Sequence, residues 1–354
     1  MKIVADENIP CVRDAFASLG NVQTVSGRAL SAADVTDAEV LLVRSVTQVD
    51  EALLRGTAVR FVASATAGVN HVDLDYLAAN HIHFANAPGS NAISAAEYVI
   101  AGISYWSLRN GIPLAGLSIG IVGCGNVGSR VQQRCEKLGM RCVLNDPPLA
   151  DQGVGGLQSL QAALACDIVT LHVPLVTTGP HPTLEMLDAQ CVESMQPGTL
   201  FINAARGDVV DEAALLARMK RSGDLSLVLD VWENEPDIDL EMLRHCLLGT
   251  AHIAGYSIDG KIRGTEMIYD ACCKYLQVAP QWSAADVDFP VAQTLVELSE
   301  SNDQVRQQIL QAYDIEADSR RLGKLLVDDS LKRGEYFDAL RKNYPVRREF
   351  TLEQ

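Results

Sequence analysis

The chain has 354 residues, of which 48% are hydrophobic, and its formal net charge is −16 at pH 7. This length is more than one compact core supports, so we expect two or three domains, and an acidic surface disfavours nucleic acid and anionic membranes as partners. No uninterrupted apolar run is long enough to span a bilayer, and acidic residues stand where a signal peptide would need its apolar core. We therefore expect a cytoplasmic globular protein.

The nine cysteines are odd in number, and no two of them have the spacing of a zinc site or a redox motif. We expect reduced, mostly buried thiols and no bound metal, with a structural disulfide or a metal site as the alternative.

Residues 1 to about 90 alternate short apolar runs with polar helical stretches, which predicts a small parallel α/β unit. The candidate strands are 2–5, 40–43, 60–63 and 83–87. A turn signal then precedes 92–109, an apolar segment whose only charge before its end is Glu97. We predict that this segment is a core helix that joins two domains.

From residue 117 to about 255 strands and helices alternate regularly, which predicts a doubly wound, Rossmann-type domain. The candidate strands are 118–122, 141–145, 167–173, 199–204 and 225–231, and the intervening helices include 127–138 and 211–221.

Residues 260–276 predict a helix whose apolar face returns to the first unit. The final residues are charge-rich but keep helical apolar spacing at Val305, Ile309 and Tyr313, which indicates an appendage that needs a partner surface. The predicted fold class is therefore α/β and has three parts. They are a flavodoxin-like α/β substrate (lid) domain at 1–92 and 257–285, a Rossmann-type NAD domain at 93–256, and a small α+β domain at 286–354.

A glycine-rich loop opens a helix directly after the strand at 118–122. In such a loop Gly123 makes the tight turn, Gly125 admits a pyrophosphate, and Gly128 lets the helix pack on the strand. Asp146 follows the next strand, 18 residues beyond Gly128, where its carboxylate suits both ribose hydroxyls and repels a 2′-phosphate. This context favours NAD over NADP, and the alternative is a strand-to-helix turn that binds nothing.

Three charged side chains each close an apolar run typical of a buried strand, at the strand end where ligands bind in open α/β sheets. Arg206 can hold a carboxylate in a bidentate manner, and His252 can act as a base near neutral pH. Glu235 can orient the imidazole. Each residue alone is more often structural, but together, after a dinucleotide loop, they favour oxidation of a 2-hydroxy acid.

The chain resembles the D-isomer-specific 2-hydroxyacid dehydrogenases in the loop 123–128 with Asp146 and in segments 172–174, 203–207, 230–236 and 252–255. In that family the residues matching Arg206, Glu235 and His252 are catalytic, and the aspartate matching Asp230 contacts the nicotinamide side of NAD. The cofactor-binding positions that the resemblance implies are Gly123, Gly125, Asn126, Val127, Gly128, Asp146, Val173, Pro174, Ala204, Ala205, Asp230 and Gly255.

Segments 3–10, 43–47, 63–73 and 255–265 resemble one subfamily, which acts on a small phosphorylated 2-hydroxy acid in vitamin B6 biosynthesis. The resemblance implies a homodimer formed through the C-terminal domain, and substrate contacts at Ser45, Thr66 and Tyr256. Gly68 and Val69 can add backbone N–H donors for an anion.

Three cations lie near these segments in the sequence, namely Arg44, Lys261 and Arg263, and we expect them to compensate a phosphate. The alternative is that each is a surface charge. The chain departs from the family at Ala251, where a proline usually precedes the histidine, so the rigidity of this loop is expected to suffer without chemical loss.

Two other functions stay open at this point. One is a dehydrogenase for another 2-hydroxy acid, such as 3-phosphoglycerate or D-lactate. The other is a non-catalytic NAD-sensing scaffold, because this fold also serves as a transcriptional corepressor.

Overall fold

The computed structural model describes residues 1–289, 291–298 and 302–353, and the chain divides into two compact units. The first unit contains Met1–Asn91 and Ser257–Ala292, and the second contains Ala92–Tyr256 and Gln293–Gln354. None of the described helices is both long and apolar enough to cross a membrane.

The first unit is built on a five-stranded parallel sheet with the strand order β2-β1-β3-β4-β5. This is the flavodoxin-like order, which confirms the predicted fold class of this unit. The strands are β1 (Lys2–Asp6), β2 (Asn21–Val25), β3 (Val40–Val43), β4 (Phe61–Ser64) and β5 (His83–Asn86). The helices are α1 (Val12–Phe16), α2 (Ala32–Val35), α3 (Glu51–Leu54), α4 (Leu74–Ala79) and α12 (Ile258–Leu276), with a 3₁₀ turn at Ala284–Asp286.

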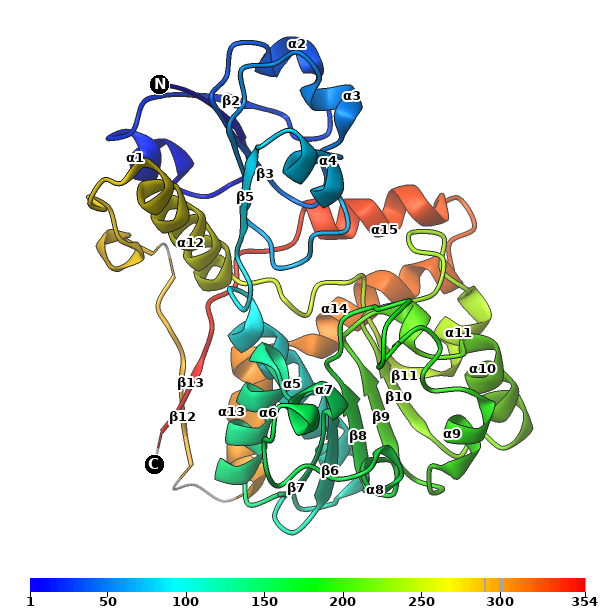
Figure 1. Cartoon of the computed structure of the whole chain (residues 1–354). Helices are drawn as coiled ribbons and strands as arrows, with labels where there is room; N and C mark the ends of the chain where they lie inside the picture. The colour runs from blue at the N-terminus through cyan, green and yellow to red at the C-terminus, as the bar shows by residue number, and fades with distance from the viewer. Residues whose placement is uncertain (290, 299–301, 354) are drawn as a thin grey trace. The chain divides into compact units, whose positions relative to one another are not determined.

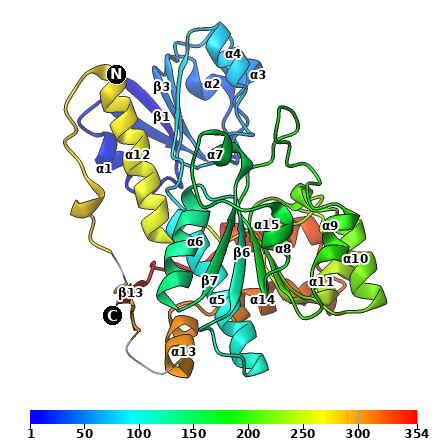
Figure 2. The same ribbon diagram turned by 60° about the horizontal axis from the view of Figure 1, so that its bottom comes forward.

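Helix α12 returns to this unit as its apolar face predicts, and Figure 2 shows it beside the five-stranded sheet. Ile268 and Cys272 of α12 are fully buried in one cluster with Phe16 and Phe61. Strand β2 was not predicted, because its residues alternate exposed and half-buried positions at the sheet edge instead of forming an apolar run.

The second unit contains a six-stranded, all-parallel sheet with the order β11-β10-β9-β8-β6-β7 (Figure 1). Its strands are β6 (Ser118–Val122), β7 (Arg141–Asn145), β8 (Ile168–Leu171), β9 (Leu200–Asn203), β10 (Ser226–Leu229) and β11 (Cys246–Gly249). The helices are α5 (Ala92–Asn110), α6 (Asn126–Lys137), α7 (Pro147–Asp151), α8 (Leu160–Leu164), α9 (Ala189–Ser194), α10 (Glu212–Arg221) and α11 (Leu240–His245), with a 3₁₀ turn at Gly207–Val209. The Rossmann-type prediction is confirmed.

Alternate residues of these strands feed two separate apolar cores, one on each face of the sheet. In β9, for example, Leu200 and Ile202 belong to the cluster that includes α5 and α6, whereas Phe201 belongs to the cluster that includes α9, α10 and α11. Covering both faces leaves only the strand ends open to ligands, which is where the charged residues of interest lie.

The C-terminal residues form β12 (Leu295–Glu297), α13 (Asn302–Ala312), α14 (Ile315–Gly323), a 3₁₀ turn at Lys324–Leu326, α15 (Arg333–Lys342) and β13 (Thr351–Glu353). Strands β12 and β13 pair in parallel as a small separate sheet. Helix α13 packs on α5, and α14 packs on β11.

The prediction that this appendage needs a partner surface to bury its apolar face is wrong. Val305, Ile309 and Tyr313 are buried in the cluster that contains α5 of the same chain. The C-terminal residues also pair the buried charge in the middle of α5. The carboxylate of Glu97 accepts hydrogen bonds from Arg347 Nη1 at 2.5 Å and from the Phe350 amide at 2.6 Å.

Candidate active site

The three charged residues of interest follow three neighbouring strands of the six-stranded sheet. Arg206 comes after β9, Glu235 after β10 and His252 after β11. These strands are adjacent and parallel, so their carboxyl ends meet at one edge of the sheet. The structure therefore brings all three residues to the same edge.

His252 and Glu235 form a hydrogen-bonded pair, with 2.7 Å between Nδ1 and Oε2. The second carboxylate oxygen, Oε1, accepts from the backbone amide of Trp232 at 3.0 Å, which fixes the carboxylate plane. The side chains are 31% and 21% exposed, so the pair borders solvent and a ligand can reach it. Because Nδ1 faces the carboxylate, Nε2 is the ring nitrogen available for proton exchange with a ligand.

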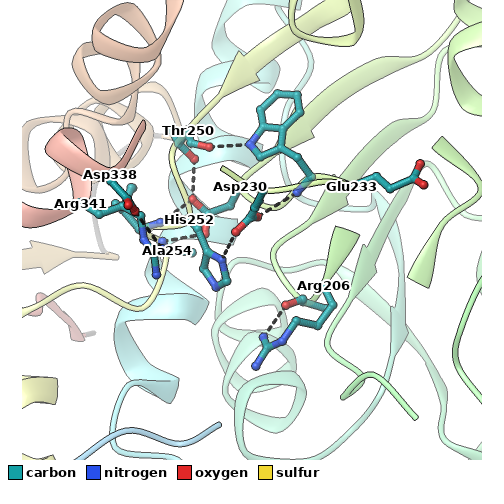
Figure 3. Close-up of polar contacts among 12 residues, drawn as sticks. Arg206, Asp230, Glu233, Thr250, His252, Ala254, Asp338 and Arg341 are labelled. Atoms are coloured by element: carbon teal, nitrogen blue, oxygen red, sulfur yellow. Dashed lines mark hydrogen bonds and ion pairs between the residues drawn. The ribbon is translucent and has the colours of Figure 1, made fainter. Parts of the chain in front are cut away.

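The loop that carries His252 has an unusual backbone, with φ of 52° at the histidine itself. This left-handed conformation costs a non-glycine residue on the order of 1 kcal/mol. Hydrogen bonds to Asp230 stabilise this loop conformation and offset the cost. The buried Asp230 carboxylate accepts from the Ile253 amide, the Ala254 amide and the Thr250 hydroxyl at 2.6–2.8 Å (Figure 3). Burial raises the pKa of Asp230, and the nearby His252 and these donors oppose the rise.

Arg206 is half-buried at the start of the 3₁₀ turn after β9, and its Nη1 donates to the Ala205 carbonyl at 2.6 Å. Asn203 holds the turn, because its side chain donates to the Arg206 carbonyl at 3.0 Å and accepts from the Ala205 amide at 3.0 Å. Gly207 is required next, since a Cβ there would lie 2.1 Å from the Trp232 backbone. The arginine is thus presented by a tightly packed turn.

The glycine loop after β6 has the features that a dinucleotide needs. Gly123 has φ of 90°, and a Cβ on Gly128 would lie 1.9 Å from the Gly123 carbonyl oxygen, so both positions demand glycine. A Cβ on Gly125 would meet no atom within 4 Å, which leaves space over the N-terminus of α6 for a pyrophosphate. The residues present therefore fit a dinucleotide.

Asp146 is tied to the same loop, because its Oδ2 accepts from the Cys124 amide at 2.8 Å and its Oδ1 accepts from the Leu149 amide at 3.0 Å. Asp146 therefore stabilises the glycine loop through these hydrogen bonds. Its position is also the one at which a residue that binds the cofactor ribose is expected, and that ribose contact stays a prediction. Asn126 and Val127 begin α6 directly after Gly125.

The sheet order reverses between β6 and β8, so the loops after these two strands flank the switch point at which such folds bind ligands. Val173 and Pro174 follow β8 there, next to His172, whose pKa burial lowers to about 3, so that its ring is neutral. Ala204 and Ala205 follow β9, and Gly255 ends the His252 loop. Their contacts with a cofactor stay predictions.

The substrate-contact positions predicted in the first unit lie on loops at the carboxyl ends of β3 and β4. Ser45 is exposed just after β3. The Thr66 hydroxyl lies 2.8 Å from the Ser64 hydroxyl, and Gly68 and Val69 continue the half-buried loop after β4. One sheet edge therefore presents hydroxyls and backbone groups together.

The three cations expected near a phosphate differ in their surroundings. Arg44 Nε donates to the buried Asp6 carboxylate at 3.0 Å, and Arg263 donates to the Ser90 carbonyl. Lys261 is exposed by its overall solvent-accessible surface, but its ammonium group lies among enough protein atoms to be partly desolvated. The pKa of this ammonium is lowered, first by that desolvation and then by the positive charge of Arg44. The positive charges of Arg44 and Lys261 thus act on each other while Asp6 pairs with Arg44, whereas Arg263 donates to a backbone carbonyl.

Two residues that sequence reasoning missed belong to this site. Thr250 anchors Asp230 and contacts the Tyr98 hydroxyl at 2.8 Å, and its place two residues before His252 was the available signal. Arg341 on α15 lies near Glu235 and Tyr256, and nothing in the arginine-rich C-terminal sequence distinguishes it from its neighbours.

Comparison with known proteins agrees with this arrangement. The family model "D-isomer specific 2-hydroxyacid dehydrogenase, NAD binding domain" matches residues 94–254, and a domain of unknown function matches residues 289–353. The first match makes NAD the cofactor. Among curated relatives, the erythronate-4-phosphate dehydrogenase of Klebsiella pneumoniae is 45% identical, and that of Hahella chejuensis is 43% identical. Each alignment covers 99% of this chain and 93% of the relative.

Solved structures share the fold. The NAD⁺-bound 3-phosphoglycerate dehydrogenase of Entamoeba histolytica superposes with a TM-score of 0.67 at 23% identity, covering 80% of this chain and 98% of that one. The D-lactate dehydrogenase of Aquifex aeolicus, complexed with NAD and lactic acid, gives a TM-score of 0.63 at 24% identity, covering 78% and 96%. From the full-length relatives and the matched NAD domain, the chain belongs to the erythronate-4-phosphate dehydrogenase family, within the D-isomer specific 2-hydroxyacid dehydrogenases.

Proposed function

We propose that this chain catalyses the NAD-dependent oxidation of 4-phospho-D-erythronate to (R)-3-hydroxy-2-oxo-4-phosphooxybutanoate in pyridoxal 5′-phosphate biosynthesis. The observation that carries the proposal is the 2.7 Å contact between His252 Nδ1 and Glu235 Oε2, at the same sheet edge as Arg206. The names of the full-length relatives supply the substrate.

Each of the three residues has a distinct role in this reaction. The Arg206 guanidinium binds the substrate carboxylate in a bidentate manner and keeps its charge at any physiological pH. His252 Nε2 takes the proton of the 2-hydroxyl as the hydride leaves the same carbon. Glu235 keeps the imidazole in the correct orientation and stabilises its charged form. Bound NAD supplies the hydride acceptor.

Arg44 and Lys261 are proposed to bind the substrate phosphate. Two like charges close together repel each other, and an anion between them removes that repulsion. Ser45, Thr66 and the backbone of Gly68 and Val69 are proposed to complete the substrate contacts of this unit. Tyr256 is proposed as a substrate contact of the second unit. A Lys261→Met variant should raise KM for a phosphorylated acid about tenfold or more. Lys274→Met, an exposed position on the same helix, is the matched control and should leave KM unchanged.

The experiment that tests the proposed substrate is a panel of 2-hydroxy acids followed by NADH absorbance. We expect the highest kcat/KM for 4-phospho-D-erythronate, with 3-phospho-D-glycerate and D-lactate well below it. A higher kcat/KM for D-lactate would contradict the assignment of a phosphorylated substrate. A higher kcat/KM for 3-phosphoglycerate would contradict the assignment of a four-carbon substrate.

A homodimer formed through residues 286–354 and a cytoplasmic location are further parts of the proposal. Four large apolar side chains among the described residues of this segment are exposed in the single chain, and Val327 at 84% and Val346 at 58% are the most exposed of them. The nine cysteines are all free thiols, as in a reducing compartment. Deleting the segment would uncover α5, so substitution is the better test. The full chain should sediment as a dimer, and the Val327→Asp/Val346→Asp double variant should sediment as a monomer. A variant that remains dimeric would place the interface elsewhere.

A further inference from the structure

Helix α15 begins beside the loop that carries Glu235. Arg333, its first residue, donates from Nη1 to the Ile238 carbonyl at 3.0 Å. A Cβ on the next residue, Gly334, would lie 3.2 Å from Pro236 Cγ, so the helix backbone runs close to the residue that follows the glutamate. The first turn of α15 is therefore fixed to this loop.

The middle of α15 faces the loop that carries His252. Ala339 and Leu340 line one side of a cavity of about 240 Å³, and Ala251 and Ile253, the two neighbours of His252, line another. Just beyond the helix the Tyr344 ring meets the Tyr256 ring edge-on, with 5.5 Å between centroids and 88° between planes. One C-terminal helix and the residues after it thus contact all three segments that present Glu235, His252 and Tyr256.

One cation on this helix acts on two of those residues. Arg341 is 26% exposed, with Nη1 3.8 Å from Asp338 Oδ1 one turn earlier, and Figure 3 shows both residues on α15 near the His252 loop. Its guanidinium hydrogen-bonds the Tyr256 side chain and experiences the charge of Glu235. Burial lowers the pKa of Arg341, but Tyr256, Glu235 and Asp338 together outweigh burial, so the pKa is raised.

We infer that Arg341 is a positioning residue for the reaction, holding the Tyr256 hydroxyl and the Glu235 carboxylate in place so that α15 becomes part of the acid/base site. This inference rests on the proposed roles of Glu235 and His252. Glu235 accepts from the Trp232 amide and contacts His252 Nδ1, and the positive charge of Arg341 attracts the same carboxylate. A misplaced orienting group can lower turnover by up to about 100-fold without touching the substrate.

The test compares three variants in steady-state assays with the 2-hydroxy acid that the wild type oxidises best. Arg341→Met keeps the aliphatic stem and removes the cation, and we expect kcat to fall on the order of tenfold. The dissociation constant of NADH, read by fluorescence, and the urea midpoint should stay at their wild-type values. Arg341→Lys should recover part of kcat. Lys342→Met, the exposed neighbour on the same helix, should match the wild type.

A double-mutant cycle with Glu235→Gln separates positioning from general support of the fold. If Arg341 acts through Glu235, adding Arg341→Met to Glu235→Gln lowers kcat by less than about twofold. A full tenfold loss in that background would overturn the inference, as would wild-type kcat in Arg341→Met or a lowered urea midpoint with weakened NADH binding. Failure of the proposed function is a separate result, because His252→Ala would then retain full turnover.

Discussion

The half-buried side chain of Glu212, next to the loop that carries Glu235, predicts how the free energy of unfolding depends on pH. Glu212 is the first residue of α10, and its Oε2 accepts from the Glu233 amide at 2.9 Å. Its surroundings are largely apolar, including Leu215, Leu229 and Val231. Burial raises the pKa of Glu212 to about 7 from an ordinary 4.5, and nearby carboxylates add to the rise.

The direction in which Glu212 changes the stability with pH follows from proton linkage. The folded chain holds this proton more tightly than the unfolded chain, so its contribution to stability is complete below pH 4.5 and is lost as the pH rises toward 7. Glutamine resembles the protonated side chain and keeps an oxygen acceptor for the Glu233 amide. The rise in the pKa from 4.5 to about 7 corresponds to roughly 3 kcal/mol of lost stability when the pH is well above 7.

The assay is urea unfolding of the wild type and of Glu212→Gln at pH 5.5 and pH 8. The free energy of unfolding gained by the variant should be larger at pH 8 than at pH 5.5 by about 2 kcal/mol. Glu335→Gln, an exposed carboxylate on α15, is the control and should show no such pH difference. Equal effects of Glu212→Gln at the two pH values would refute the reasoning.

Three further predictions concern the cofactor loop and the His252 loop. Gly128→Ala should lower the unfolding midpoint because its Cβ would meet the Gly123 carbonyl, whereas Gly125→Ala should leave the midpoint unchanged and weaken NADH binding, read by fluorescence. Asp146→Ala should reduce the ratio of kcat/KM for NAD to that for NADP, and an unchanged ratio would assign ribose recognition to another residue. Thr250→Val removes one donor from the buried Asp230 and should cost about 1–3 kcal/mol in urea unfolding, with a lower kcat; wild-type values would contradict the anchoring role.

The sequence allowed much of the sheet framework to be predicted, because parallel strands buried on both faces read as continuous apolar runs. The strands predicted at 118–122 and 141–145 coincide with β6 and β7, and the predicted helix at 92–109 is α5. A strand before His252 was expected, but the bounds of β11 were not predicted, because this strand follows α11 without a turn. The strand ends were predictable because the charged residues interrupt the apolar runs.

Contacts between segments distant in sequence could not be predicted. Arg44 and Lys261 come from separate stretches of the chain, and only the fold shows their proximity. The same holds for Arg341, whose neighbours Tyr256 and Glu235 lie about 100 residues earlier. Asp230 was expected on the cofactor side, and the structure adds that it organises the His252 loop, because hydrogen bonds to backbone amides depend on loop conformation and leave no spacing pattern.

The central claim is that His252, paired with Glu235, is the acid/base of a dehydrogenase. The most direct measurement is turnover of 4-phospho-D-erythronate by His252→Ala, with NADH binding measured on the same preparation. We predict that kcat falls by about 100-fold or more while the dissociation constant of NADH stays within about twofold of the wild-type value. Turnover equal to the wild type, with NADH still bound, would contradict the account.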